Sequence, residues 1–150
     1  MSIIVYRRGV LAADTLITAG DLRAGYSTKI ARSPQGHMGG GAGSLEGCAA
    51  FLAWIRDGCK GSPPDVGGEQ DWLLVGPPKR GAREISYGTG KGLLAPMHPN
   101  GPKGSTWAAS GSGERIAAGA LWMGATAVEA VEAAIALSST CGGRVETLTT

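Results

Sequence analysis

Ser2 is the residue best suited to chemistry, because removal of the initiator methionine would make it the N-terminal residue. A free α-amino group has a pKa of about 7.7–8.0, so it can act as a general base at neutral pH. A serine that carries such an amine holds a nucleophilic hydroxyl and its base on one residue. Many chains begin with Met-Ser, so this feature needs support from other residues.

Two charged residues could tune that amine. Asp14 ends the second of two apolar segments, residues 2–6 and 10–14, which are joined by a turn and predict a β-hairpin. A lysine beside the amine would disfavour its protonated form, and Lys29 is the candidate for this role. Asp14 would hold the lysine ammonium in place. The alternative is an ordinary ion pair, or two unrelated charges in solvent.

The segment Gly39-Gly-Gly-Ala-Gly-Ser44 predicts a strand end that runs into a helix start. Its backbone N–H groups, with a helix dipole behind them, could form an oxyanion hole. One such donor is typically worth roughly 10²–10³ in rate. Phosphate could bind in the same way, but no lysine follows the glycines as it does in phosphate-binding loops. A tight strand–helix crossing without a ligand is the structural alternative.

The elements that position these residues are predicted from hydrophobic periodicity and turn signals. Strands are expected at residues 2–6, 10–14, 28–31, 71–75, 83–87, 106–109 and 144–148. Helices are expected at residues 44–57, 114–123 and 126–137. Ser44 and Thr126 are typical N-cap residues for two of these helices. Residues 58–68 predict a loop, whereas the Gly- and Pro-rich residues 88–103 have no clear assignment. This order of elements predicts one α+β layered sandwich domain over residues 1–150.

Composition and charge argue against nucleic-acid binding and against a membrane span. The net charge is +2, from 14 basic and 12 acidic residues that are interspersed, so no clustered basic face for nucleic acid is expected. No apolar run approaches the roughly 18 residues that a membrane span needs. The start of the chain also lacks the order of a signal peptide, since Arg7 and Arg8 follow the apolar segment rather than precede it. We therefore expect a cytoplasmic protein that binds neither nucleic acid nor membrane.

The other residues with reactive side chains do not form a recognisable site. Cys48, Cys59 and Cys141 are widely spaced and include no C-x-x-C pair, so buried reduced thiols are expected rather than disulfides or a zinc site. His37 and His98 are expected at a strand end and in a loop, rather than as catalytic bases. No metal or other cofactor is expected.

Five segments, taken in order, resemble proteasome β subunits and the bacterial HslV peptidase. They are Ser-Ile-Ile-Val-Tyr-Arg-Arg-Gly-Val-Leu-Ala-Ala-Asp-Thr15, Lys29-Ile30, Gly-Gly-Ala-Gly-Ser44, Ser-Gly-Ser-Gly113 before a predicted helix, and Cys-Gly-Gly-Arg-Val145. Each segment is weak alone, but the ordered set is fairly specific and covers nearly the whole chain. The resemblance is strongest to short phage and prophage members of this family.

This resemblance implies a fold and a mechanism. The fold would be a four-layer αββα sandwich of the N-terminal-nucleophile (Ntn) hydrolase type, and the activity that of a peptidase or amidohydrolase on a peptide or amide substrate. Ser2 matches the family's nucleophile, Asp14 its acid and Lys29 its lysine. Gly40 matches the glycine that donates its N–H in the oxyanion hole, and Ser112 matches the serine that helps to shuttle the proton of the amine. A homo-oligomer is also expected from the family.

The chain departs from the family pattern in several places. The family's nucleophile is normally threonine, and the opening hairpin is shorter here. Ser138 and Cys141 stand where proteasome subunits usually carry an aspartate and a serine. One helix, residues 44–57, fills an outer layer where the family has two, and the loop 58–68 replaces the second. An ATP-dependent unfoldase partner is therefore less expected than a homo-oligomer, because docking depends partly on that layer.

The alternative function is a catalytically inactive scaffold with the same fold. A phage structural or host-interaction protein, acting in the host cytoplasm, would be an example. The lost loop aspartate and the missing helix favour this alternative. Retention of the initiator methionine would also favour it, because the amine would then not belong to Ser2.

Overall fold

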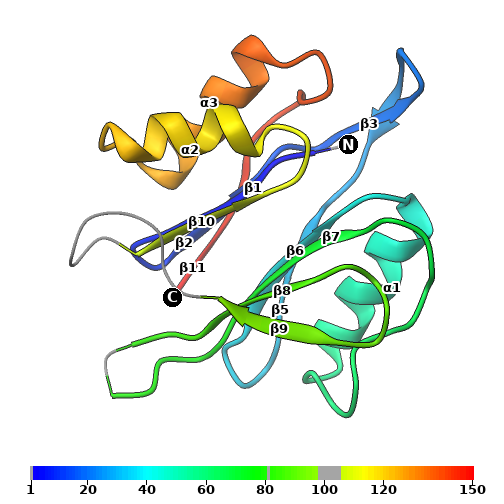
Figure 1. Ribbon diagram of the computed structural model, residues 1–150, viewed down its shortest axis with the longest axis vertical. Coiled ribbons are helices and arrows are strands. Elements are labelled where there is room, and N and C mark those ends of the chain that lie inside the picture. Colours follow the sequence, from blue (N-terminus) through cyan, green and yellow to red (C-terminus); the bar gives the residue numbers. More distant parts are fainter. Residues whose placement is uncertain (1, 81, 98–105) are drawn as a thin grey trace.

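The computed structural model describes residues 2–80, 82–97 and 106–150, which fold into an α+β structure with antiparallel sheets (Figure 1). The first sheet has the strand order β10 (Trp107–Ser110), β1 (Ile4–Arg7), β2 (Val10–Ala13) and β11 (Glu146–Thr149). The second sheet has the order β5 (Ile30–Arg32), β6 (Met38–Ala42), β7 (Asp71–Val75), β8 (Ile85–Gly88) and β9 (Leu94–Met97). A separate two-stranded sheet consists of β3 (Leu16–Ala19) and β4 (Leu22–Tyr26). The predicted α+β class is therefore confirmed.

The helices of the described residues are α1 (Leu45–Arg56), α2 (Glu114–Trp122) and α3 (Ala127–Leu137). Figure 1 shows α2 and α3 together over the first sheet and α1 against the second sheet. The Ser44 hydroxyl caps α1 by accepting the N–H of Gly47 at 3.0 Å. Thr126 and Glu129 form a capping box at the start of α3. Both predicted N-caps are confirmed.

Strands β1 and β2 are almost entirely buried, which explains their nearly unbroken apolar sequence. Successive side chains of a strand point to opposite faces of its sheet. Val5 and Ala12 therefore belong to a core cluster with α2 and α3, whereas Ile4 and Leu11 belong to a cluster with Leu73 of the second sheet. The first sheet consequently packs against helices on one face and against the second sheet on the other.

The opposite face of the second sheet packs against α1. The rings of Phe51 in α1 and Trp72 in β7 are stacked, with centroids 4.4 Å apart and planes inclined by 5°. Ile55 and Leu52 of α1 complete this cluster, and all four side chains are buried. Between α1 and β7, residues 58–68 contain no helix, as predicted.

Several strands differ from the sequence prediction. The sheet β3–β4 was not predicted, because β4 is largely exposed and has no buried face. The strand β9 lies within the unassigned residues 88–103, at the edge of its sheet, where Pro96 is tolerated. The strand expected at 28–31 begins only at Ile30, and the strand expected at 144–148 lies at Glu146–Thr149.

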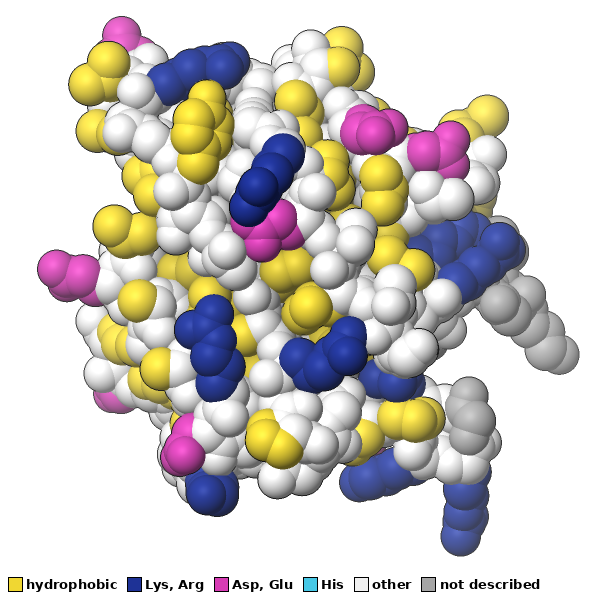
Figure 2. Space-filling view, turned by 180° about the vertical axis from the view of Figure 1, so that it is seen from behind, with side chains coloured by type: hydrophobic (Ala, Val, Ile, Leu, Met, Phe, Trp, Pro, Cys, Tyr) yellow, Lys and Arg dark blue, Asp and Glu magenta, His cyan; other side chains and the backbone are white. Residues whose placement is uncertain are grey.

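The surface carries charges of both signs. Figure 2 shows one face of the molecule, on which basic and acidic side chains are separated by apolar and uncharged surface. No helix in the described part of the chain has the length and apolar character that crossing a membrane would require. His98 lies outside the described residues.

Candidate active site

Asp14 and Lys29 form a buried ion pair, with 2.8 Å between Lys29 Nζ and Asp14 Oδ1. Asp14 is fully buried and Lys29 is 6% exposed. The Lys29 ammonium also donates to the Leu16 carbonyl oxygen at 2.6 Å. Asp14 accepts two further hydrogen bonds, from the N–H groups of Ile3 at 3.1 Å and Gly142 at 3.0 Å. The structure thus brings together the acid and the lysine that the sequence singles out.

Ser2 lies directly before β1 and is only 3% exposed. Its backbone nitrogen, which becomes the α-amine once Met1 is removed, donates to Ser112 Oγ at 3.1 Å. The Ser2 carbonyl oxygen accepts from Ser112 Oγ and from the Gly113 N–H, each at 3.3 Å. Gly111 has a φ of 111°, and a Cβ at this position would collide with the Ser2 carbonyl. The loop before α2 therefore holds Ser2 in place through its backbone and through Ser112.

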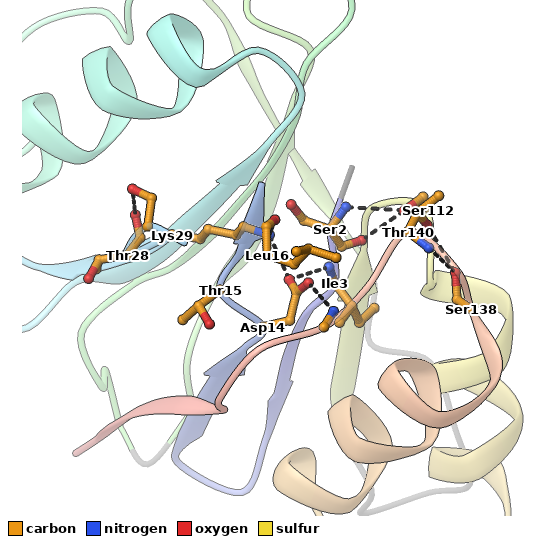
Figure 3. Close-up of polar contacts among 12 residues, drawn as sticks. Ser2, Ile3, Asp14, Thr15, Leu16, Thr28, Lys29, Ser112, Ser138 and Thr140 are labelled. Atoms are coloured by element: carbon orange, nitrogen blue, oxygen red, sulfur yellow. Dashed lines mark hydrogen bonds and ion pairs between the residues drawn. The ribbon is translucent and has the colours of Figure 1, made fainter. Parts of the chain in front are cut away.

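A pocket of about 180 Å³ opens between Ser2, Lys29 and the glycine segment that precedes α1. Its more apolar walls come from Leu16, Ile17, Leu45 and Cys48. Burial raises the pKa of the Cys48 thiol, so this side chain is neutral at pH 7. The volume is below the roughly 300–1,000 Å³ of drug-sized ligand sites and suits a single side chain. Figure 3 shows Ser2 between the Lys29–Asp14 pair on one side and the hydroxyl group of Ser112 on the other.

Asp14 and Ser112 do not line this pocket but are hydrogen-bonded to Lys29 and Ser2, which do. Gly40, the remaining predicted site residue, does not line it either. It lies within β6, where it pairs with Ile30 of β5 on one side and with Leu73 of β7 on the other. In an interior strand each N–H faces a neighbouring strand, so the N–H of Gly40 is directed into the sheet. A Cβ at Gly40 would lie 2.7 Å from the Lys29 carbonyl oxygen and 3.1 Å from Ile4 Cδ1. The glycine is therefore explained by close packing of the backbone.

Gly43, three residues further along the chain, lines the pocket instead, together with Ser2. Its N–H has no acceptor among the described residues. The neighbouring N–H of Gly41 is occupied, because it donates to the Lys29 carbonyl oxygen at 3.1 Å. The φ of Gly43 is 124°, and a Cβ there would collide with the Gln70 side chain. Gly43 thus offers a free donor on a backbone that only glycine can adopt.

Thr140 belongs to the site although the sequence did not single it out. Its Oγ1 lies 2.8 Å from Ser112 Oγ and 2.9 Å from Ser138 Oγ. Figure 3 shows the three hydroxyl groups on the side of Ser2 away from Lys29. The run of hydroxyl residues at 138–140, just before the Cys-Gly-Gly segment, is the signal that could have indicated it.

The remaining residues with reactive side chains, the histidines and cysteines, form no second site in the part of the chain that the structure describes. Among the described residues, no group of three or more His, Cys, Asp or Glu side chains could hold a metal ion. His37 lies just before β6, as predicted, and its Nδ1 contacts Ser33 Oγ at 3.0 Å. Cys48 and Cys141 are buried and Cys59 is partly exposed, and all three are free thiols.

Comparison with protein-family models and with curated proteins found no match for this chain. Its function must therefore be inferred from the geometry of the pocket.

Proposed function

We propose that the chain is an Ntn-type peptidase or amidohydrolase, of the proteasome β and HslV kind, in which Ser2 is the nucleophile after removal of Met1. The proposal includes a four-layer αββα sandwich in which α1 alone forms one outer layer. The packing of the first sheet against α2 and α3, and of the second sheet against α1, supports this arrangement.

The observation that carries the proposal is the surroundings of Ser2. Its nitrogen contacts the Ser112 hydroxyl, and it shares a pocket with the Lys29 ammonium that Asp14 holds in place. A fixed positive charge near an amine disfavours the protonated amine, so the base stays available at neutral pH. Ser2 and Lys29 line one pocket, and Ser112 and Asp14, from other segments of the chain, are hydrogen-bonded to them.

In the first half of the reaction, Ser2 Oγ attacks the carbonyl carbon of an amide, and the hydroxyl proton passes to the α-amine. The negative charge that develops on the carbonyl oxygen is stabilised by the free N–H of Gly43, near the start of α1. The carbon–nitrogen bond then breaks, and the ammonium of Ser2 returns its proton to the departing amine. The product is an ester between the acyl group and Ser2 Oγ.

In the second half, a water molecule attacks this ester, and the α-amine of Ser2 takes one of its protons. The ester bond breaks, the ammonium protonates Ser2 Oγ, and a carboxylic acid leaves. Lys29 does not exchange protons in either half, because its two hydrogen bonds hold it as a structural cation.

The experiment is covalent labelling of protein that begins at Ser2, released from an N-terminal fusion. A β-lactone or a peptide vinyl sulfone should add one label to the N-terminal peptide, as detected by mass spectrometry. Ser2→Ala should abolish the label. Ser27→Ala is the matched control, because Ser27 lines the same pocket and, within the described parts of the chain, its hydroxyl is hydrogen-bonded only to the Thr28 carbonyl oxygen.

Labelling that persists in Ser2→Ala, or that never occurs in protein starting at Ser2, would contradict the proposal. Cell-made protein should also lack Met1 in the same mass spectra. Uniform retention of Met1 in the cell would mean that the site is not used there.

The second candidate is an inactive scaffold with the same fold. The observation that favours it is the layer formed by α1, where residues 58–68 supply no second helix. In this case Ser2→Ala would leave the biological role of the protein unchanged, whereas deletion of the protein would abolish it.

A further inference from the structure

A chain of three hydroxyl groups leads away from the Ser2 nitrogen. Ser112 Oγ lies 3.1 Å from that nitrogen and 2.8 Å from Thr140 Oγ1. Thr140 Oγ1 lies 2.9 Å from Ser138 Oγ, which also accepts the Thr140 N–H at 3.3 Å. Thr140 therefore provides a direct hydroxyl link between Ser112, in the loop before α2, and Ser138, which ends α3, and the Cys141 thiol lies beside all three hydroxyl groups.

Each hydroxyl group can donate one hydrogen bond and accept others, so this chain has two directions. When the α-amine is protonated, it donates to Ser112, whose one proton can go to the Ser2 carbonyl oxygen at 3.3 Å or to Thr140 Oγ1, and in the second case Thr140 donates to Ser138. When the amine is neutral, its lone pair accepts from Ser112, which accepts from Thr140, which accepts from Ser138. The same atoms thus solvate both protonation states of the amine.

We infer that Thr140 is a positioning residue that orients the Ser112 hydroxyl toward the α-amine of Ser2 and lets it reverse as the amine gains and loses its proton. This inference rests on the proposed function, in which that amine is the general base. It assigns to Thr140 a role that the resemblance to the family does not give it. It also explains how the site works with a serine at position 138 in place of an aspartate.

The ionisable groups that surround this chain of hydroxyls are Asp14, Lys29, Glu69, Asp71, Glu114 and Cys141. Within the described residues, none of the carboxylates is hydrogen-bonded to Ser112 or Thr140. A carboxylate can only accept, so it would stabilise the protonated amine and raise its pKa. Burial and the charge of Asp14 raise the pKa of the Cys141 thiol, so this neighbour is neutral at pH 7. Because the three linked hydroxyl groups carry no charge, they do not stabilise the protonated amine in the way a carboxylate would, and the amine stays available as a base.

The test uses protein that begins at Ser2 and carries ¹³C-labelled serine. The pKa of the α-amine is measured by NMR from the pH dependence of the Ser2 resonances, assigned with Ser2→Ala. The rate of acylation by a β-lactone is measured over the same pH range. The NMR measurement does not depend on catalysis, so a failure of this inference and a failure of the proposed function give different results.

Thr140→Val removes the linking hydroxyl with little change in volume. We expect the acylation rate to fall about tenfold, as for the loss of one hydrogen bond. The pKa of the amine should rise, because Ser112 then donates to the Ser2 carbonyl oxygen and only accepts from the ammonium. Thr140→Ser should restore both values. Thr147→Val is the control, since this exposed threonine of β11 has no side-chain hydrogen bond among the described residues.

Ser138→Asp tests whether the chain of hydroxyl groups must be uncharged, by adding a carboxylate to it. A carboxylate at the end of the chain should raise the pKa of the amine by about one unit and move the acid limb of acylation to higher pH. The inference is overturned if Thr140→Val keeps the wild-type amine pKa and acylation rate, or if Thr140→Ser does not restore them. If the wild-type protein is not acylated at all, the amine pKa values alone decide the inference.

Discussion

Asp14 is completely buried, yet its carboxylate accepts hydrogen bonds from the Lys29 ammonium and from two backbone N–H groups. A buried charge is tolerated only when it is paired and hydrogen-bonded in this way. The pairing also immobilises Lys29, whose ammonium would otherwise extend into solvent. The consequence for function is a positive charge that stays beside the pocket of Ser2.

Lys29→Met should therefore destabilise the protein strongly, because it leaves the Asp14 carboxylate buried without its cation. We expect the free energy of unfolding in urea to fall by about 3–5 kcal/mol. Lys60→Met is the control, since the ion pair of Lys60 with Asp57 spans 3.9 Å and both side chains are mostly exposed. That change should cost less than about 1 kcal/mol. If the two substitutions lowered the free energy of unfolding equally, the buried ion pair would contribute no more to stability than the exposed one.

At the scale of the elements, the loop between β10 and α2 holds Ser2 in place. It donates to the Ser2 carbonyl oxygen through Ser112 Oγ and the Gly113 N–H. Gly111 allows this approach, because its positive φ and the closeness of the Ser2 carbonyl exclude a side chain. The start of β1 and the start of α2 are thus held together over a long distance in sequence.

Gly111→Ala tests this loop. A side chain at a positive φ is strained and would push against Ser2, so we expect the free energy of unfolding to fall by about 2 kcal/mol or more. Labelling of Ser2 should fall with it. Gly119→Ala is the matched control, because a Cβ at this position in α2 meets no atom within 4 Å. That substitution should stabilise the helix by about 0.5–1 kcal/mol. An unchanged free energy of unfolding in Gly111→Ala would contradict the close approach of Gly111 to the Ser2 carbonyl.

For the molecule as a whole, stability depends on the packing of the two larger sheets against each other. Apolar side chains of β1 and β2 share a core cluster with those of β5 to β8. A polar contact adds to it, because the Tyr87 hydroxyl of β8 donates to the Ala109 carbonyl oxygen of β10 at 2.8 Å. The pocket lies between Ser2, which precedes β1 of the first sheet, and β6 of the second sheet, so its geometry depends on this packing.

Tyr87→Phe should remove the polar contact between the sheets and cost about 0.5–1.5 kcal/mol at pH 7. Burial, followed by the charge of Glu114, raises the pKa of Tyr87 to about 12, although the hydrogen bond to Ala109 lowers it. The folded state therefore holds this proton more tightly than the unfolded state. The resulting stability is complete below pH of about 10 and is lost as the pH rises towards about 12.

Urea unfolding of wild type and Tyr87→Phe between pH 9 and 12 measures this difference, which should shrink as the pH rises. Tyr26→Phe is the control, because Tyr26 is 66% exposed and its hydroxyl makes no hydrogen bond among the described residues. A difference between wild type and Tyr87→Phe that stays constant over this range would refute the assignment.

The sequence alone predicted the features that depend on local chemistry. The N-caps at Ser44 and Thr126 follow from hydroxyl groups placed before helical patterns, and the hairpin of β1 and β2 follows from two apolar segments joined by a turn. Ser2, Asp14, Lys29 and Ser112 could be named because their side chains are chemically distinctive. The exposed strand β4 was not predicted, since it has no buried face.

Two features of the site depended on contacts between distant segments. Nearby glycines look alike in a sequence, and only the pairing of β6 with β5 and β7 directs the N–H of Gly40 into the sheet. Gly43 follows β6 and lines the pocket, and its N–H has no acceptor among the described residues. Thr140 joins the site only because the chain after α3 returns beside Ser112. The types of residue around Ser2 can therefore be predicted from the sequence. The direction in which each hydrogen-bond donor points depends on strand pairing and on packing between segments that are far apart in the chain.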